Sequence, residues 1–176
     1  MPTSTFLTPC SKSSDQPTEV KVSIGATAPP FDLEGTLGTP ESRRSYSLTE
    51  FRGSPVVLVF YPADASPVCT AQLMSYTNDI DRFGELGAQV LAISPQGVEQ
   101  HEHFATQLGG LAFPLLADTE RAVGGAYGVM GRIGFYRRSV FVVDGEGVVR
   151  YAHRATAGFT FRPVDELVEV LAGLTG

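Results

Sequence analysis

Cys69 lies where a buried strand is expected to end and a helix to begin. The apolar, β-branched run at 56–61 is typical of a central strand covered on both faces, and Pro62 ends it. Ser66 is a natural helix N-cap and Pro67 suits the first helical position, so Cys69 falls in the first turn. A thiol there meets unpaired backbone N–H groups and the positive end of the helix dipole. Both favour the thiolate, which is the nucleophilic form of cysteine.

The elements that must position Cys69 alternate between strands and helices along the chain. Short apolar runs predict strands, and apolar residues at helical spacing predict helices. This order predicts an α/β fold, a three-layer sandwich whose central mixed β-sheet is flanked by helices. In open sheets of this kind, active sites lie at the carboxyl ends of strands, where Cys69 stands. We expect strands near 31–33 and at 56–61, 89–94, 115–117, 139–143 and 148–153, a loop or hairpin at 35–46, helices at 69–83, 98–108 and 163–174, and a brief helix that Asp118 caps and that reaches Tyr127.

The length and composition suit one globular domain. The chain has 176 residues, of which 43% are hydrophobic, and this is enough for a core without metal or disulfide staples. Residues 1–19 are dominated by Ser, Thr and Pro, and burial cannot offset the entropy of ordering such a segment. We therefore expect a flexible tail at 1–19 and a single domain at 20–176. The net charge of −6 and the lack of a basic stripe exclude nucleic acid as an expected partner.

The cysteines and the distribution of apolar residues indicate where in the cell the protein acts. Cys10 and Cys69 lie too far apart in the sequence to make a disulfide framework, and they form no CxxC pair for zinc. No positively charged stretch followed by an apolar one marks a secretory signal. No apolar run approaches the roughly 20 residues of a membrane span. We therefore expect a cytoplasmic protein with no membrane partner and no metal or other cofactor.

Pro62, Ser66 and Cys69 together form the motif Pro-x-x-x-Ser-x-x-Cys. With this motif and its flanks, the chain resembles the peroxiredoxins, in particular the bacterioferritin-comigratory or Q-type branch, whose pattern is Pro-x-x-x-Thr/Ser-x-x-Cys. In order and spacing, the resemblance covers about residues 20–175 and implies a thioredoxin-like fold. Further matches lie at 25–31, 60–64, 113–118, 127–129 and 138–144, and Arg138 stands where the family has its active-site arginine.

The resemblance implies a thiol-dependent peroxidase that reduces hydrogen peroxide and organic hydroperoxides. Cys69 would be the nucleophile and would become a sulfenic acid. Arg138 would stabilise the thiolate and hold a peroxide oxygen. The Ser66 hydroxyl and the Cys69 backbone N–H would donate hydrogen bonds, and Pro62 would shield the sulfur from water. Arg137 and Arg138 point to opposite faces of a strand, and the family register selects Arg138 unless a bulge shifts the strand.

Two departures from the family bear on the mechanism. Many relatives carry Glu three residues after the nucleophile, where this chain has Gln72, whose amide can still hydrogen-bond the arginine. Many Q-type relatives carry a resolving cysteine five residues after the nucleophile, where this chain has Met74. The other cysteine, Cys10, lies in the expected tail. We therefore expect a one-cysteine cycle, in which an external thiol such as thioredoxin, glutaredoxin or a small-molecule thiol reduces the sulfenic acid.

Other interpretations stay open from the sequence alone. Cys10 on a long tether could resolve the sulfenic acid in a two-cysteine cycle, because loop-closure costs grow slowly with length. The domain could also be a non-catalytic thioredoxin-like binding module, although such a module has no need of Ser66, Cys69 and Arg138 together. Relatives of this branch include monomers and homodimers, and the sequence does not decide between them.

Several polar residues are not expected to take part in the chemistry. His101 and His103 lie two positions apart on an expected helix, a spacing that does not put two ligands on one face, so both are expected on the solvated surface. Structural, solubility and loop-turning roles are expected for His153, for Arg43 and Arg44, and for Asp64 respectively.

Overall fold

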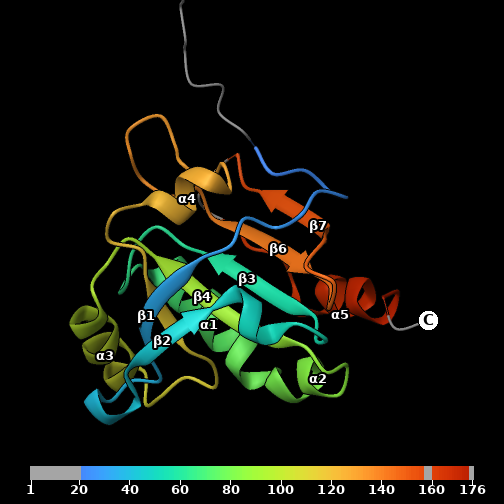
Figure 1. Cartoon of the computed structure of the whole chain (residues 1–176). Helices are drawn as coiled ribbons and strands as arrows, with labels where there is room; N and C mark the ends of the chain where they lie inside the picture. The colour runs from blue at the N-terminus through green and yellow to red at the C-terminus, as the bar shows by residue number, and fades with distance from the viewer. Residues whose placement is uncertain (1–20, 157–159, 175–176) are drawn as a thin grey trace, which may run out of the picture.

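The computed structural model describes residues 21–156 and 160–174, and within them seven strands form one mixed sheet in the order β2-β1-β5-β4-β3-β6-β7 (Figure 1). The three inner strands β3, β4 and β5 run parallel. The hairpin β1–β2 adds to the β5 edge and the hairpin β6–β7 adds to the β3 edge, both with antiparallel pairing. The strands are β1 (Asp32–Thr36), β2 (Arg44–Ser47), β3 (Val56–Phe60), β4 (Gln89–Ser94), β5 (Leu115–Ala117), β6 (Ser139–Val143) and β7 (Val149–Arg154).

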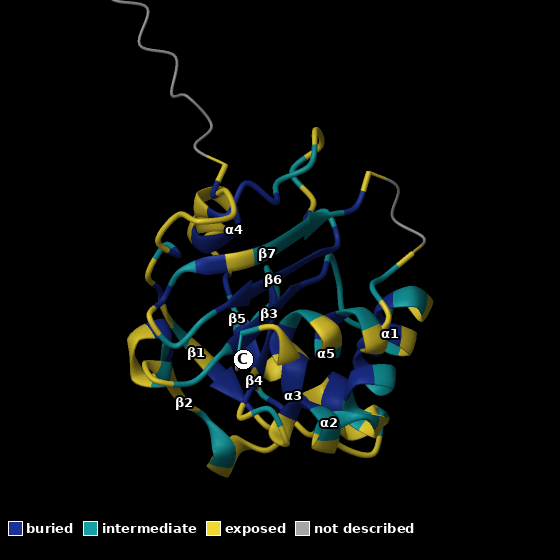
Figure 2. Ribbon diagram, turned by 90° about the vertical axis from the view of Figure 1, so that its right-hand side faces the viewer, coloured by how far each residue is buried: buried dark blue, intermediate teal, exposed yellow. Residues whose placement is uncertain are grey.

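Helices cover both faces of the sheet unequally. Four of the described helices pack on one face, and the short α4 packs on the other beside the N-terminal segment. Figure 2 shows the central strands as buried and the outer sides of the helices as exposed. The predicted α/β class, a mixed sheet flanked by helices, is thus confirmed. The helices are α1 (Pro67–Asn78), α2 (Ile80–Gly84), α3 (Val98–Gln107), α4 (Ala122–Ala126) and α5 (Val164–Ala172), and two 3₁₀ turns, η1 (Pro40–Ser42) and η2 (Leu48–Phe51), flank β2.

Strand β3 is the centre of the fold. Each of its residues is at most 1% exposed. Successive side chains point to opposite faces, so Val57 and Val59 join the core under α1, α3 and α5, while Leu58 and Phe60 join the core on the other face. The Tyr61 N–H donates to the Ile93 carbonyl at 3.1 Å and continues the pairing for one residue before Pro62 ends it. The site segment therefore leaves the most deeply buried strand of the sheet.

The expected helix at 69–83 is in fact two helices. α1 ends at Asn78, Asp79 takes a non-helical conformation, and α2 then runs to Gly84. Asn and Asp favour helix ends because their side chains compete for the backbone. Near the C-terminus, Pro163 is the N-cap of α5 rather than its first residue. Within α5, the fully buried Leu167 and Leu171 each contribute about 1.5–3 kcal/mol of burial free energy.

Arg43 has a structural role that the sequence did not predict. Its Nε and Nη2 donate to the two carboxylate oxygens of Glu102 on α3 at 2.5 and 2.7 Å. The hydrogen bond from Arg43 lowers the pKa of Glu102. The expectation that Arg43 is a solubility charge is therefore wrong: the paired guanidinium fastens the β1–β2 connection to α3. Arg44 does lie on the surface, where it pairs with Glu50.

The expected tail at 1–19 lies outside the described residues. Among the helices that the structure describes, none combines the length and the apolar character needed to cross a membrane.

Candidate active site

Cys69 occupies the third position of α1 and is completely buried. The first helical hydrogen bond runs from the Thr70 N–H to the Ser66 carbonyl at 2.9 Å. The backbone N–H groups of Val68 and Cys69 therefore precede the hydrogen-bond ladder, at the positive end of the helix. The predicted placement of the thiol in the first helical turn is confirmed.

Arg138 reaches Cys69 from the neighbouring strand. In the antiparallel register, Phe60 of β3 pairs with Ser139 of β6, so Arg138 comes just before β6 and beside the carboxyl end of β3. Its Nη2 donates to the Cys69 Sγ at 3.0 Å, and the arginine is only 3% exposed. Arg137 instead donates from its Nη2 to the Gly128 carbonyl at 2.8 Å. Of the two arginines, Arg138 is thus the one that contacts the sulfur.

The turn before α1 carries local strain. Ala65 has φ 58°, in the left-handed region that non-glycine residues rarely adopt. Ser66 is the N-cap of α1, but its side chain makes no capping hydrogen bond, contrary to one of its two expected uses. Its hydroxyl is therefore not committed to the helix end. Strained backbone of this kind is common at functional sites, where surrounding contacts hold it.

Gln72 does not form the hydrogen bond to Arg138 that the sequence suggested. Its side chain is fully buried, and its Nε2 donates to the Tyr76 hydroxyl at 3.4 Å. The Tyr76 hydroxyl in turn donates to the Arg162 carbonyl at 2.7 Å. Among the described residues, the Gln72 Oε1 has no hydrogen-bond partner. The amide thus links α1 to the segment before α5.

A buried polar network lies behind the site, and it contains His101, for which the predicted place on the solvated surface is wrong. His101 on α3 is 0% exposed. Its Nδ1 lies 2.8 Å from Asp64 Oδ2, and its Nε2 lies 3.3 Å from the Leu116 carbonyl. The Tyr61 hydroxyl donates to Asp64 Oδ1 at 2.8 Å. Burial, reinforced by the Asp64 charge, raises the pKa of Tyr61 well above its usual value.

The helical spacing of α3 contains the signal that would have placed His101 correctly. Val98, His101 and Ala105 lie three and four residues apart, and all three are buried. His101 therefore belongs to the inward stripe of an amphipathic helix, whereas His103 lies on the outer side and contacts Gln107. Spacing between the two histidines alone could not reveal this.

A small cavity opens beside the site. It has a volume of about 190 Å³, and both Pro62 and Arg138 contribute to its walls. Its apolar rim includes Ile133 and Phe135, which are 82% and 58% exposed. The arginine that contacts the sulfur thus forms part of the cavity wall. Its remaining wall residues are Gly131, Tyr136, Arg137, Ala155 and Thr156.

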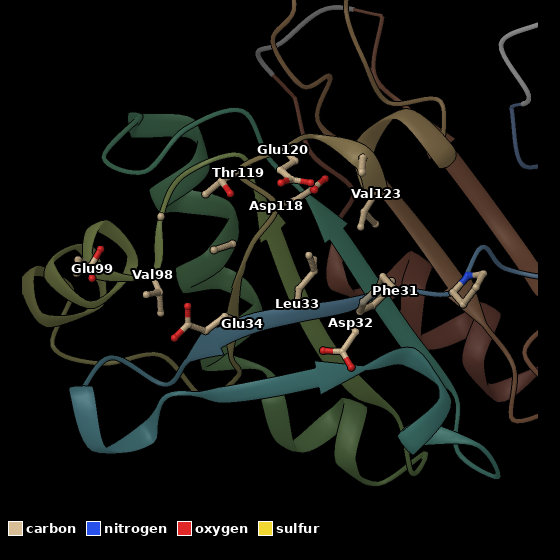
Figure 3. Close-up of a pocket in the computed structure, with 14 residues that line it drawn as sticks. Phe31, Asp32, Leu33, Glu34, Val98, Glu99, Asp118, Thr119, Glu120 and Val123 are labelled. Carbon is tan, nitrogen blue, oxygen red and sulfur yellow. The ribbon is translucent and has the colours of Figure 1, made fainter. Parts of the chain in front are cut away.

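A cavity of about 640 Å³ lies elsewhere, between β1, the start of α3 and the segment before α4 (Figure 3). Carboxylates from Asp32, Glu34, Glu99 and Glu120 border it. Neither Cys69 nor Arg138 contributes to its walls, so it is separate from the thiol chemistry. Cys10, the proposed resolving residue of the alternative cycle, lies outside the described residues.

Comparison with known proteins agrees with this geometry. The AhpC/TSA family model matches residues 24–152. Peroxiredoxin Q from chloroplasts of Sedum lineare is 35% identical over 159 residues, which cover 88% of this chain and 80% of the relative. The solved structure of Mycobacterium bovis AhpC superposes with a TM-score of 0.82 at 28% identity and covers 89% of this chain and 94% of that one. Mycobacterium tuberculosis AhpC gives a TM-score of 0.81 at 26% identity with the same coverage.

The fold, the cysteine in the first turn of a helix, the arginine on its sulfur and the family match all agree. The chain therefore belongs to the AhpC/TSA family and is a peroxiredoxin of the Q-type branch, a thiol-dependent peroxidase with a thioredoxin-like fold.

Proposed function

We propose that this peroxiredoxin reduces hydrogen peroxide and organic hydroperoxides by a one-cysteine cycle at Cys69. The observation that carries the proposal is the hydrogen bond from Arg138 Nη2 to the Cys69 Sγ at 3.0 Å, inside a buried site at a helix N-terminus. The thiolate attacks one peroxide oxygen, a sulfur–oxygen bond forms and the oxygen–oxygen bond breaks. The leaving oxygen takes a proton and departs as an alcohol or water, and Cys69 is left as a sulfenic acid.

The other site residues have roles that follow from their chemistry. Arg138 carries a permanent positive charge, which stabilises the thiolate and then the negative charge on the leaving oxygen. The Ser66 hydroxyl and the Cys69 backbone N–H hold the peroxide in line with the sulfur. Pro62 has no N–H to bind water and lines the cavity that leads to the site. Gln72 acts through packing and through Tyr76 rather than by contact with peroxide.

The second half of the cycle uses an external thiol. Position 74, where many relatives have a resolving cysteine, is Met74, and Cys69 is the only cysteine among the described residues. A thiol such as thioredoxin, glutaredoxin or a small molecule reduces the sulfenic acid to regenerate the thiolate. The protein acts in a reducing compartment, for which the cytoplasm is our proposal.

The test is a stoichiometric pulse of hydrogen peroxide given to reduced wild type and to Cys69→Ser and Cys10→Ser variants, with a sulfenic-acid trap present. Intact mass and free-thiol count are read within seconds. We expect trapped sulfenic acid at Cys69 in the wild type, the same result in Cys10→Ser, and no reaction in Cys69→Ser.

Two other outcomes would replace the proposal. Loss of two hydrogens with both thiols consumed would make Cys10 the resolving residue of a two-cysteine cycle. A Cys69 thiol that persists after the pulse would contradict peroxidase chemistry in this chain and favour a non-catalytic binding module.

A further inference from the structure

A second cavity, lined by positive side chains, adjoins the cavity at the active site. Its volume is about 710 Å³, and its walls are Lys21, Met130, Gly131, Arg132, Arg137 and Thr156. Three of these six residues also form the wall of the smaller cavity beside Pro62 and Arg138, so the two cavities share a boundary: Gly131, Arg137 and Thr156. We refer to the larger one as the cationic cavity.

Within the described part of the chain, the three cations of this cavity have no acidic partner. Among the described residues, no carboxylate forms an ion pair with Lys21, Arg132 or Arg137, although the chain has a net charge of −6. The Arg137 Nε is buried and has no hydrogen-bond partner there. Three like charges in one cavity repel each other, and a bound anion offsets that repulsion and accepts hydrogen bonds from the guanidinium groups.

The cationic side chains stand on a backbone that is already organised. Met130 pairs with Tyr136 in an antiparallel bridge, and the Gly131 N–H donates to the Phe135 carbonyl at 2.7 Å. Arg132 therefore stands near the tip of a hydrogen-bonded turn. Binding an anion on such a framework needs little ordering of the chain.

Lys21 is held against the same framework by a close approach to Gly128. A Cβ built on Gly128 would lie 2.8 Å from the Lys21 Cγ, and Gly128 has φ +63°. Only glycine combines that conformation with room for the lysine. The Gly128 carbonyl also accepts the hydrogen bond from Arg137, so one residue positions two of the cations.

We propose that the cationic cavity binds the carboxylate of a small anionic thiol, which is the reductant of the Cys69 sulfenic acid. This inference rests on the proposed one-cysteine cycle. With its carboxylate in the cationic cavity, the thiol extends through the shared boundary into the cavity beside Arg138. Because Cys69 is completely buried, any thiol needs some rearrangement of the site to reach the sulfur, and a small thiol needs less than a thiol on a folded redoxin does.

The reduction step balances in atoms and electrons. The thiolate of the reductant attacks the sulfenic sulfur, a disulfide bond forms, and the sulfur–oxygen bond breaks to release hydroxide, which becomes water on protonation. A second molecule of the thiol attacks the sulfur of the bound reductant and releases the Cys69 thiolate and a small-molecule disulfide.

The acidic cavity of Figure 3 differs from the cationic cavity in the charge of the ligand that it favours. It is of similar size, but carboxylates surround it, so it repels the ligand that the cationic cavity attracts. Of these two cavities, the one that adjoins the active site is therefore the one that attracts an anion.

The experiment measures how fast the preformed sulfenic acid reacts with two matched thiols, N-acetylcysteine and its uncharged amide. One equivalent of hydrogen peroxide forms the sulfenic acid, and rapid quenching followed by intact mass measures its loss, because the chain has no tryptophan to report the reaction. Rates are divided by the thiolate fraction of each thiol. We expect the carboxylate-bearing thiol to react about tenfold faster than the amide, through local electrostatic attraction.

Charge-removing variants localise the effect. We expect Arg132→Gln and Lys21→Gln each to lower the rate with N-acetylcysteine about three- to tenfold and to leave the amide rate unchanged. Arg52→Gln is the matched control, because Arg52 is exposed and far from both cavities, beside the turn at Glu146. Equal rates for the two thiols in the wild type, or an equal loss in Arg52→Gln, would overturn the proposal.

Two further arms separate this proposal from its alternatives. The first arm compares fatty-acid hydroperoxides with their methyl esters as oxidants of Cys69. If the preference for a carboxylate appears in this oxidation step instead, the cavity holds the oxidant and the reductant assignment is wrong.

The second arm tests the anion site without redox chemistry. It uses NMR to follow the binding of S-methyl-N-acetylcysteine to the reduced protein. We expect Arg132→Gln to weaken that binding, and no binding to wild type contradicts the site. Failure of the sulfenic acid to form at all would contradict the proposed function separately.

Discussion

At the scale of single residues, the proposed chemistry depends on one positive group, Arg138, in contact with one sulfur, that of Cys69. Cys69 and Arg138 are 69 positions apart in the sequence, and both are nearly excluded from water. In such surroundings a charge interacts more strongly than it does at the surface, because less solvent screens it. The hydrogen bond to the Cys69 Sγ comes from Nη2 of a planar guanidinium, whose positive charge is permanent.

We expect Arg138→Gln to slow the oxidation of Cys69 by hydrogen peroxide about 100- to 1000-fold, because it removes a preorganised positive donor. Arg138→Lys should react at an intermediate rate, because lysine keeps the positive charge but lacks the planar guanidinium with its several N–H donors. The measurement is the rate of thiol loss after a peroxide pulse, with circular dichroism to confirm folding. Arg52→Gln should react as the wild type does. If Arg138→Gln also did so, the arginine would have no electrostatic role.

At the scale of elements, the loop between β3 and α1 is held from behind by α3. Asp64 accepts a hydrogen bond from the Tyr61 hydroxyl and contacts the buried His101, and its backbone N–H donates to the Gln96 side chain. Pro62 and Ser66 lie on this loop, so the network sets where both stand. His101 acts as a positioning residue, without contact to the sulfur.

We expect Asp64→Ala to destabilise the fold by about 1–3 kcal/mol, because it leaves the Tyr61 hydroxyl and the His101 Nδ1 buried without their partner. Asp64→Asn should cost less, since the amide can still hydrogen-bond. Urea unfolding measures the change, and the peroxide reaction should also slow as the loop loosens. Asp165→Ala is the control, because that carboxylate is 83% exposed and pairs only at the surface. Equal effects of Asp64→Ala and Asp165→Ala would show that the buried network does not stabilise the loop.

At the scale of the whole molecule, buried tyrosines connect the layers. Tyr76 links α1 to the segment before α5, and Tyr127 donates to the Pro29 carbonyl on the other face. Burial raises the pKa of Tyr76 to about 12 and raises the pKa of Tyr127 further. Burial is also the largest cause of the raised pKa of three other tyrosines: Tyr61, Tyr136 and Tyr151.

These shifts predict alkaline instability. Above about pH 10 the unfolded chain loses tyrosine protons that the folded chain keeps, so the free energy of unfolding falls as pH rises. The stability that the raised tyrosine pKa values contribute is fully present below about pH 10. It is lost as the pH rises through the pKa values of the tyrosines in the folded protein. Urea titrations across this range should show a falling midpoint, and Tyr76→Phe should make the decline shallower. Reversible ionisation of every tyrosine near pH 10 in the folded protein would contradict the prediction.

Local pattern was enough to predict the frame of the site. The strand at 56–61, the break at Pro62 and a helix with Cys69 in its first turn depend on neighbours in sequence, and all three are present. The prediction of a single helix at 69–83 was wrong. The helical spacing of apolar residues continues across Asp79, whereas the helical conformation of the backbone is interrupted there. Periodicity reports which side chains are buried and does not by itself show whether the helix between them is continuous.

The sequence by itself determined the class of fold and the place of Cys69 in the first turn of a helix, because caps, strand periods and helix periods are local properties of the chain. Tertiary structure decided the contacts. Arg138, the arginine that the family resemblance selects, reaches the sulfur because of the register of β6 against β3. Packing of α3 buries His101 on Asp64. The cationic cavity gathers residues from near 21, 130–137 and 156, which only the folded chain brings together. Such contacts depend on strand register and helix packing over long separations, and no local pattern encodes either.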